Sequence, residues 1–531
     1  MTLQLALQPV LIAGEWRSAD SPVGSFTAMN PATQTALPDE YPVSSLADVE
    51  LAIRAAQEAV VALRSLSPDH LANFLEAFAA NIEARAEALV EMAHLETAYP
   101  KATRLSATEL PRTTNQLRQA AAAARSRSWV HANIDTQANI RSMFAPLNGA
   151  VVVFGPNNFP FAFNSVAGGD FAAAIAAGNP VIAKANLGHP GTTRLLAEAA
   201  FEAVRTTGLP DAMIQLIYHM PAEVGFALVS HPLIGATGFT GSRNAGMRLK
   251  AAADQAGKPI YLEMSSVNPI FVLPGALTER GQDIAADFTA SCLLGAGQFC
   301  TNPGMVVLVD NEQGQAFVNA ASESFQSKPA GILLSERGPR NIADSIEILQ
   351  QHGAEVLVGG KAVSDFGFAF QNTLLRVSGD IFDQHADALQ TEAFGAVSLL
   401  VVARDEVQLI EIARHLDGNL TGSIYSDRQG SDDALYAQLE PVLRPKVGRL
   451  LNDKMPTGVA VSPAMNHGGP YPATGHPGFT SVGIPASMLR FAALYSYDNV
   501  RPQRLPPELQ DKNPTGHTWR LIDGEWTQRD M

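Results

Sequence analysis

The chain has 531 residues, of which 46% are hydrophobic and 17% charged, and it carries a formal net charge of −15. One hydrophobic core does not grow to this size, so the chain should divide into two or three domains. The acidic balance argues against nucleic acid and anionic membranes as partners, since both need clustered Lys and Arg, although a local basic pocket can still hold a small anionic substrate.

Two cysteines, Cys292 and Cys300, are too few for a disulfide framework, and they form no cysteine-based metal site, so we expect no metal. They suit a reducing compartment. The apolar residues 1–13 lack a basic region and are interrupted by glutamines and Pro9, which makes a poor signal peptide. No uninterrupted apolar run approaches the roughly 20 residues that cross a bilayer. We therefore predict a cytoplasmic protein without a membrane partner.

Residues 46–125 carry apolar side chains at helical spacing, and residues 131–145 look extended. From residue 150 onward, short β-rich runs alternate with helices, which is typical of a parallel sheet covered on both faces. The expected strands are 150–154, 180–184, 213–218, 235–239 and 259–263, and the helices between them are near 162–177, 191–207, 221–230 and 242–256.

A second α/β segment is predicted from about 264 to 465. Its strands are expected near 268–273, 305–309, 354–358, 396–402, 421–425 and 448–452, and its helices near 280–294, 311–325, 338–352, 405–415 and 431–440. Residues 490–531 are extended, proline-rich and charged, like an arm or tail. The hexamers 11–16 and 521–526 have nearly the same sequence, which suggests two similar hairpin edges.

The most informative segment places Cys300 on a glycine-punctuated turn after an apolar helix. Gly295 and Gly297 let the backbone approach a ligand closely. A thiol on such a turn is suited to attack an electrophilic carbon once its proton is removed. A buried cysteine that packs as a small hydrophobe is the competing interpretation, and it is the one that we adopt for Cys292 inside the helix.

Two further polar residues follow predicted strands. Glu263 ends the strand 259–263, where a carboxylate within reach of the thiol could activate water. Asn158 lies in the turn after strand 150–154, where its amide could stabilise an oxyanion. Taken alone, each has an ordinary interpretation, a solvated acid and a turn asparagine. The carboxyl ends of parallel strands meet at one edge of a sheet, so the two should lie near one another and near Lys184 and Ser242.

A strand-to-helix turn at residues 239–246 contains Gly241 and Ser242, and the helix that follows offers its free amides to a phosphate. The same turn could simply be capped by Ser242. As a bare motif it is weak, because it is not the usual Gly-x-Gly-x-x-Gly pattern.

Together these segments resemble the aldehyde dehydrogenase superfamily. The resemblance runs from about residue 11 to about residue 500 and keeps the family's order and spacing. Its motifs are Asn158-Phe159-Pro160, Ala177-Gly178-Asn179-Pro180 leading to Lys184, Phe239-Thr240-Gly241-Ser242, Glu263, Gly297-Gln298-Phe299-Cys300 and Glu392-Ala393-Phe394-Gly395.

The resemblance implies an α/β fold with a Rossmann-type parallel-sheet cofactor domain, an α/β catalytic domain and a β oligomerisation arm. We expect the cofactor domain at 1–130 and 149–263, the catalytic domain at 264–465, and the arm and tail at 131–148 and 490–531. It also implies a homodimer or homotetramer.

The resemblance also implies roles for individual residues. Cys300 would be the nucleophile, Asn158 and the Cys300 amide would hold the oxyanion, and Glu263 would activate water. The cofactor would be bound by Lys184 at the adenosine ribose, by Gly241 and Ser242 at the pyrophosphate, and by Glu392 with Phe394 at the nicotinamide ribose. As an isolated acid, Glu392 would more often be a surface group.

Within the superfamily, the chain is similar to the branch that oxidises 2,5-dioxovalerate, also called α-ketoglutarate semialdehyde, to 2-oxoglutarate. The segments that carry this similarity are 297–304, 263–269, 165–170 and 467–474. One position departs from the branch: Gly478 stands where an arginine is usual, and an arginine would be a natural partner for a substrate carboxylate. An uncharged aliphatic or aromatic aldehyde is the alternative substrate.

The cofactor is expected to be NADP or NAD. Members that prefer NAD often place a glutamate three residues after the lysine that corresponds to Lys184, and here that residue is Leu187. Nothing at this position repels a 2′-phosphate, and Lys184 or Arg243 could attract one, which favours NADP.

Three rival functions were weighed. A cysteine hydrolase would need a histidine beside the thiol, and none of the twelve histidines is in the cysteine motif. A dehydrogenase that passes the thioester to CoA is disfavoured by Glu263 at the water-activating position. A structural protein without turnover is disfavoured because each reactive position of the motif is filled.

Overall fold

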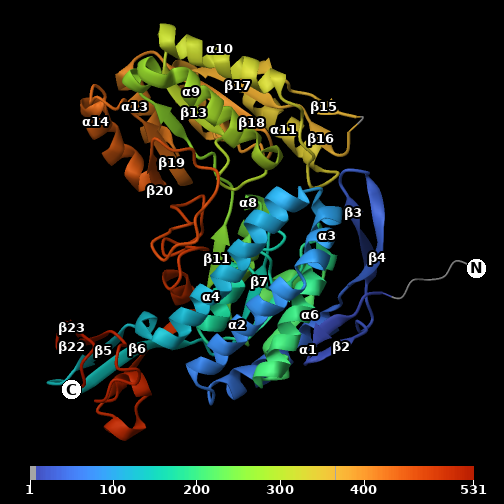
Figure 1. Cartoon of the computed structure of the whole chain (residues 1–531), viewed down its shortest axis with the longest axis vertical. Coiled ribbons are helices and arrows are strands. Elements are labelled where there is room, and N and C mark those ends of the chain that lie inside the picture. The colour runs from blue at the N-terminus through green and yellow to red at the C-terminus, as the bar shows by residue number, and fades with distance from the viewer. Residues whose placement is uncertain (1–6, 365) are drawn as a thin grey trace, which may run out of the picture.

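The computed structural model describes residues 7–364 and 366–531. Two α/β units lie one above the other, and a β-rich arm extends from the lower unit (Figure 1). The lower unit contains helices α1 to α8, and the upper unit contains α9 to α14. This is the α/β architecture that the alternating strand and helix pattern predicts.

The lower sheet has the strand order β11-β10-β7-β8-β9-β1-β2. Strands β7 to β11 run parallel, and β1 adds to β9 in the antiparallel direction. The strands are β1 (Val10–Ile12), β2 (Glu15–Arg17), β7 (Ala150–Phe154), β8 (Val181–Lys184), β9 (Ile214–Ile217), β10 (Ile234–Thr240) and β11 (Ile260–Glu263). The five predicted parallel strands are confirmed to within two residues at each end.

The register of these strands aligns the candidate residues at one edge. Phe154 pairs with Lys184, and Thr240 pairs with Glu263, so the last residues of β7, β8, β10 and β11 lie side by side. Asn158 and Ser242 follow directly after two of these ends. The expectation that these side chains share the carboxyl edge of the sheet is confirmed.

Helices surround this sheet, and their apolar faces form the largest buried cluster with it. They are α1 (Leu46–Leu63), α2 (Pro68–Ala84), α3 (Ala86–Thr97), a π-helix η1 (Lys101–Glu109), α4 (Leu110–Ser126), α5 (Gly169–Ala176), α6 (Pro190–Thr207), α7 (Ala222–Ser230) and α8 (Arg243–Gln255). The helical character predicted for 46–125 is confirmed. A π-helix is rare and is often found at functional sites.

The helix predicted at 162–177 begins only at Gly169, so that prediction was wrong at its start. Buried side chains hold the preceding residues in turns. Glu109 accepts hydrogen bonds from the backbone N–H groups of Phe161 and Ala162, and Asn164 accepts one from Val166. These side-chain acceptors take the place of helical carbonyls, which the apolar spacing of the segment does not reveal.

The upper sheet has the order β14-β17-β18-β13-β12-β19-β20. Its strands are β12 (Ile270–Val272), β13 (Met305–Val309), β14 (Glu355–Val358), β17 (Thr373–Ser378), β18 (Val397–Ala403), β19 (Asn419–Tyr425) and β20 (Val447–Asn452). Alternate residues of β13 enter two different core clusters, Met305 and Val307 on one face and Val306 and Leu308 on the other. Both faces of this sheet are therefore buried, as its near-continuous apolar strands predict.

The helices of the upper unit are α9 (Pro274–Leu293), α10 (Glu312–Ser327), α11 (Gly338–Gln351), α12 (Gly379–Leu389), α13 (Glu406–His415) and α14 (Asp433–Leu443). Sequence analysis missed β17 and α12. Ser378 explains the junction, because it ends the strand and its side chain accepts a hydrogen bond from Ile381 as the N-cap of α12. The Ser378-Gly379-Asp380 sequence at this boundary was the available signal, a capping residue followed by a glycine and an acid.

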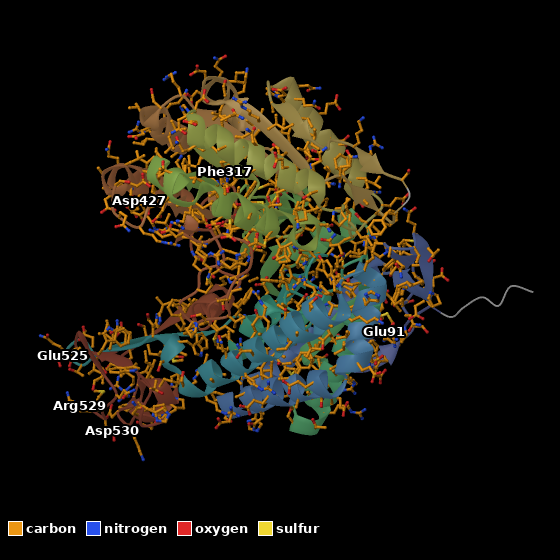
Figure 2. All side chains as sticks on the ribbon, turned by 45° about the horizontal axis from the view of Figure 1, so that its top comes forward. Glu91, Phe317, Asp427, Glu525, Arg529 and Asp530 are labelled. Atoms are coloured by element: carbon orange, nitrogen blue, oxygen red, sulfur yellow. The ribbon has the colours of Figure 1, made fainter. Side chains whose placement is uncertain are left out.

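The arm joins residues that are far apart in the chain. Its sheet has the order β21-β6-β5-β22-β23, with β5 (Ala132–Asp135), β6 (Ile140–Pro146), β21 (Ala492–Asp498), β22 (Arg520–Ile522) and β23 (Glu525–Thr527). The charged side chains of Glu525, Arg529 and Asp530 lie at its outer end (Figure 2). Two separate segments expected to be extended therefore pair into one sheet.

The repeated hexamer forms the same hairpin twice. Leu11 pairs with Trp16 and Ile12 with Glu15, while Leu521 pairs with Trp526 and Ile522 with Glu525. The first hairpin extends the lower sheet and the second extends the arm. Further hairpins are β3 (Gly24–Asn30) with β4 (Thr35–Val43), and β15 (Ala362–Val363) with β16 (Ala369–Phe370). Among the helices in residues 7–364 and 366–531, none is long and apolar enough to span a bilayer.

Candidate active site

The turn that carries Cys300 is built by consecutive left-handed residues. Gly295, Ala296 and Gly297 have φ values of 58°, 56° and 71°. A Cβ on Gly297 would lie 2.1 Å from the backbone of Gly395, so only glycine permits this approach. The close contact brings the 392–395 motif against the cysteine turn. Two sequence-predicted segments thereby meet through their glycines.

A buried network also fixes this turn to the upper sheet. The Asn268 side chain donates 2.9 Å hydrogen bonds to the carbonyl oxygens of Cys300 and Asn302. Its own oxygen accepts hydrogen bonds from Ser266 and Thr421. Because each end of this amide is satisfied, the backbone around the thiol is rigidly positioned.

The Cys300 thiol faces a histidine and a carboxylate. Its Sγ lies 3.2 Å from Nε2 of His467, and the same Nε2 lies 3.3 Å from Oε1 of Glu263. All three ligand atoms fall within 4.8 Å of one another. Glu263 and His467 are almost completely buried, at 1% and 2% exposure, whereas Cys300 is only half-buried. A thiol, an imidazole and a carboxylate therefore converge at one point.

Strand β11 and the loop after it hold the two partners of the thiol. Glu263 forms an isolated antiparallel bridge with Thr474, and the Met264 amide donates to the Ala473 carbonyl at 2.8 Å. This contact lays residues 467–481 along the end of β11. Ser481 Oγ then donates to the second carboxylate oxygen of Glu263 at 3.0 Å. The loop thus supplies His467 and also orients Glu263.

Charge and burial set the protonation of this cluster. Burial alone would raise the pKa of Glu263, but the neighbouring His467 and the hydrogen bonds from Ser481 and Cys300 outweigh burial and lower it below its usual value. Burial raises the pKa of the Cys300 thiol well above its ordinary range, and the Glu263 charge adds to that rise. At neutral pH the pair is therefore a protonated thiol beside an ionised carboxylate.

Asn158 lies next to the cysteine turn and is 4% exposed. Its side-chain Nδ2 donates to the backbone carbonyl of Gln298 at 2.9 Å. The backbone carbonyl of Asn158 accepts hydrogen bonds from the side chains of Tyr99 and Arg104. An amide nitrogen carries two hydrogens, so one donor remains for an oxyanion. The ordinary interpretation, an asparagine that bonds its own turn, does not describe this contact, which joins two distant segments.

The cofactor-facing candidates lie at the carboxyl edge of the lower sheet. Ser242 caps α8, its side chain accepting from the Ala245 amide at 3.4 Å, and residues 242–245 are exposed. Lys184 ends β8, where burial lowers the pKa of its amine to about 8, and among the described residues it has no salt-bridge partner. An unpaired cation beside an open helix N-terminus fits the phosphates and ribose of a dinucleotide. Leu187 is 42% exposed near this edge.

Glu392 and Phe394 lie half-buried on the opposite side of the cysteine turn. Burial raises the pKa of Glu392 to about 7, and hydrogen bonds with Ser265 and the Ser266 backbone oppose the rise. The surface-group interpretation of Glu392 is therefore wrong. A carboxyl group near the thiol fits a ribose hydroxyl of the same dinucleotide.

An open cavity of about 710 Å³ leads toward the cysteine turn. The π-helix η1, the first turns of α4 and the loop at 458–461 form its walls. Phe159 and Phe299 line its inner part, with ring centroids 5.4 Å apart. Its size suits a small organic molecule, since ligand pockets typically measure about 300–1,000 Å³.

Sequence analysis missed His467 as a partner of the thiol. The absence of a histidine from the cysteine motif was used against a cysteine hydrolase, and that argument was wrong, because the histidine comes from a loop in a distant part of the chain. The segment 467–474 was noted only as a feature of the branch. The only signal in the sequence was a histidine at the start of the glycine-rich segment 467–474, and that segment alone does not indicate a contact with Cys300.

Comparisons with known proteins agree with this geometry. The model of the aldehyde dehydrogenase family matches residues 16–441, and the chain belongs to that family. The protein is accordingly an enzyme that oxidises an aldehyde with NAD(P) as the electron acceptor.

Two curated relatives resemble nearly the whole chain. Alpha-ketoglutaric semialdehyde dehydrogenase 2 of Azospirillum brasilense is 40% identical over 506 residues, covering 91% of this chain and 93% of its own. Alpha-ketoglutaric semialdehyde dehydrogenase of Acinetobacter baylyi is 37% identical over 496 residues, covering 91% and 92%.

Among solved structures, a mutant of aldehyde dehydrogenase C from Pseudomonas syringae with NAD+ and octanal has a TM-score of 0.79 at 20% identity, covering 94% of this chain and 98% of its own. A 1-pyrroline-5-carboxylate dehydrogenase mutant from Thermus thermophilus has the same TM-score at 21% identity, with 92% of each chain covered. These likenesses establish the fold.

Proposed function

We propose that the enzyme oxidises 2,5-dioxovalerate to 2-oxoglutarate, with NADP or NAD as the cofactor, through a thioester on Cys300. The close convergence of Cys300, His467 and Glu263 carries this proposal. The names of the two curated relatives support the substrate, because each is an alpha-ketoglutaric semialdehyde dehydrogenase. An uncharged aldehyde is the alternative, since Gly478 stands where the branch has an arginine.

In the first step, the thiol gives its proton to Nε2 of His467, which lies 3.2 Å from the sulfur, and the Glu263 carboxylate 3.3 Å from that nitrogen stabilises the charge on the ring. The protonated His467, between sulfur and carboxylate, stabilises the thiolate. The sulfur then attacks the aldehyde carbon and forms a thiohemiacetal. The free amide hydrogen of Asn158 and the Cys300 backbone N–H stabilise its oxyanion, and losing one such donor typically costs about a hundredfold or more in rate.

Lys184, Gly241 and Ser242 would hold the cofactor at one end, and Glu392 with Phe394 at the other. The bound cofactor would supply a hydride acceptor for the carbon attached to Cys300. Glu263 then removes a proton from water, and the water oxygen displaces the sulfur to give the acid. The thiolate recovers its proton from His467, and Glu263 releases its own proton to solvent. Leu187 is exposed at a position where an acidic side chain would repel a 2′-phosphate. Because leucine carries no charge, this position favours NADP.

The assignment of domains follows the same division as the sheets. We propose 1–130 with 149–263 as the cofactor domain, 264–465 as the catalytic domain, and 131–148 with 490–531 as an arm for homodimers or homotetramers. Exposed apolar side chains on the arm, including Leu494 at 60%, Tyr495 at 40% and Trp526 at 56%, support an oligomeric contact there.

The function is tested with a panel of aldehydes and both cofactors, measured by formation of reduced cofactor. We expect oxidation of 2,5-dioxovalerate with a kcat/KM above that of uncharged aldehydes, and a preference for NADP. If uncharged aldehydes were oxidised and 2,5-dioxovalerate were not, the proposed substrate would be wrong. A tenfold preference for NAD, which is about 1.4 kcal/mol, would contradict the argument from Leu187.

A further inference from the structure

We propose that Arg112 is the specificity-determining residue that binds the carboxylate of the substrate in the cavity above Cys300. This inference rests on the proposed aldehyde oxidation and adds the group that selects an anionic aldehyde. It also accounts for Gly478, because a guanidinium from a different element takes over the task of the arginine that the branch usually has at that position.

The charges around the cavity do not balance. Arg104 and Arg112 are the charged side chains in the described lining. Arg104, on the π-helix, pairs with the fully buried Glu109 at 3.1 Å and also donates to the Asn158 carbonyl. Arg112, at the start of α4, has no salt bridge among the described residues. One positive charge is therefore uncompensated in a protein whose net charge is −15.

The guanidinium of Arg112 also has nitrogens without a hydrogen-bond partner. Its Nη1 donates to the Val459 carbonyl at 2.9 Å, whereas Nε and Nη2 are buried without a partner. Buried, unpaired guanidinium nitrogens are costly, because desolvation is not repaid. Nε and Nη2 lie on one side of the planar group, which is the arrangement that binds a carboxylate through two parallel hydrogen bonds.

The surroundings of Arg112 hold its guanidinium in place. It stacks over the Phe163 and Phe159 rings, with its central carbon 5.1 and 5.8 Å from their centroids. Phe163 in turn contacts the His467 ring, at a centroid distance of 5.7 Å. The cation is therefore preorganised beside the reacting cluster, and its charge lowers the pKa of the Cys300 thiol against the larger effect of burial.

A second cation lies close by but is already engaged. Arg449 on β20 donates to the carbonyls of Pro456 and Gly458 at 2.6 and 3.2 Å, which holds the loop that forms the cavity wall. It is not in the cavity lining. Arg112 is thus the cation that combines a place in the cavity with two free nitrogens.

The test compares two aldehydes of equal chain length, 5-oxopentanoate and pentanal, in wild-type enzyme, Arg112→Met and Arg118→Met. Arg118 is on the same helix but is 46% exposed and paired with Glu83, so its variant controls for the substitution itself. We expect Arg112→Met to lower kcat/KM for 5-oxopentanoate by about 100-fold or more relative to pentanal, whose smaller loss reflects only the missing effect of the charge on the Cys300 thiol. Arg118→Met should change neither.

Arg112→Lys adds a readout of geometry, because lysine keeps the charge but not the two parallel donors. It should recover part of the loss, and glutarate should inhibit pentanal oxidation in wild-type enzyme and in Arg112→Lys but not in Arg112→Met. Arg112→Lys also keeps the proposal testable if Arg112→Met does not fold. The proposal is overturned if both aldehydes lose the same factor, which would mean a structural role, or if the ratio of the two kcat/KM values does not change. The proposed aldehyde oxidation fails separately, if wild-type enzyme oxidises neither aldehyde nor 2,5-dioxovalerate.

Discussion

The two cysteines of this chain lie in one segment, and their surroundings differ in nearly every respect. Cys292 is on α9, is 0% exposed, and packs among the apolar residues of the upper sheet. Burial raises the pKa of its thiol to about 12. Its nearest polar contacts are long, 3.8 Å to the Val397 carbonyl and 3.7 Å to Asn302. It is a small core residue.

Cys300 is half-buried, and its thiol faces a polar cluster. A histidine, a carboxylate and the charge of Arg112 act on its sulfur. The comparison teaches that burial by itself makes a thiol inert, because it disfavours the thiolate. A reactive thiol needs a nearby acceptor for its proton, and we propose that His467 provides it here, with the Glu263 carboxylate beside its ring.

The largest effect that this comparison predicts is on the nucleophile. Cys300→Ser should lower aldehyde oxidation by at least about a thousandfold, because a serine hydroxyl is a far weaker nucleophile at the same position. Binding of NADP, followed by quenching of protein fluorescence, should stay close to wild type. Residual oxidation within tenfold of wild type would show that the sulfur of Cys300 is not the nucleophile.

Replacement of the carboxylate should separate the two halves of the reaction. Glu263→Gln should slow thioester hydrolysis by about 100-fold or more, since the general base for water is lost. Stopped-flow absorbance should then show a burst of reduced cofactor before a slow steady state. Ser481→Ala, which removes only a hydrogen bond to that carboxylate, is the matched control and should have a smaller effect. Steady-state turnover of Glu263→Gln at the wild-type rate would exclude its role as base.

The histidine that sequence analysis missed should matter at the acylation step. His467→Gln keeps a polar group of similar size but loses the ring nitrogen between sulfur and carboxylate. We expect the burst itself to slow by about 10- to 100-fold, with hydrolysis less affected. An unchanged burst rate would leave His467 as a packing residue beside Phe163.

The pH dependence of alkylation distinguishes the two thiols without substrate. Burial and then the Glu263 charge raise the pKa of Cys300, so the thiolate is a small fraction at neutral pH, and its alkylation by iodoacetamide should speed up as the pH rises. Glu263→Gln removes the negative charge, which lowers the thiol pKa and shifts the midpoint of the profile to lower pH. A shift to higher pH would contradict the assigned electrostatics. Cys292 should stay unmodified in the folded protein at every pH tested.

The smallest predicted effect belongs to Cys292. Cys292→Ala should leave kcat/KM within about twofold and cost about 1–2 kcal/mol of unfolding free energy, because it opens a small cavity in a packed core. Thermal or urea unfolding measures this loss. If this variant lost oxidation as completely as Cys300→Ser does, the division of roles between the two thiols would be wrong.

Much of this picture could be predicted from the chain alone because it depends on local patterns. The strands around Phe154, Lys184 and Glu263 follow from their apolar runs, and the shared edge follows from the geometry of parallel sheets. The turn of Cys300 follows from its glycines. Even the two hairpins with the sequence Leu-Ile-x-Gly-Glu-Trp are readable from the repeated letters.

Long-range placement could not be predicted in the same way. His467 reaches the thiol only because loop 467–481 pairs with the end of β11, and no spacing in the sequence encodes that contact. Arg112 is one of many arginines on amphipathic helices, and only the fold shows that its nitrogens are buried and unpaired. The helix expected at 162–177 was shortened by the buried carboxylate of Glu109, which lies in a distant part of the chain.

The most direct test of the account traps the acyl group on its sulfur. Glu263→Gln enzyme is mixed with NADP and 2,5-dioxovalerate, quenched in acid during the slow phase, digested, and sequenced by tandem mass spectrometry, which distinguishes the two cysteines. The account predicts an acyl adduct on Cys300, removable by hydroxylamine, with Cys292 unmodified. Reduced cofactor formed in the burst with no adduct on Cys300, or with the adduct on Cys292, would contradict it.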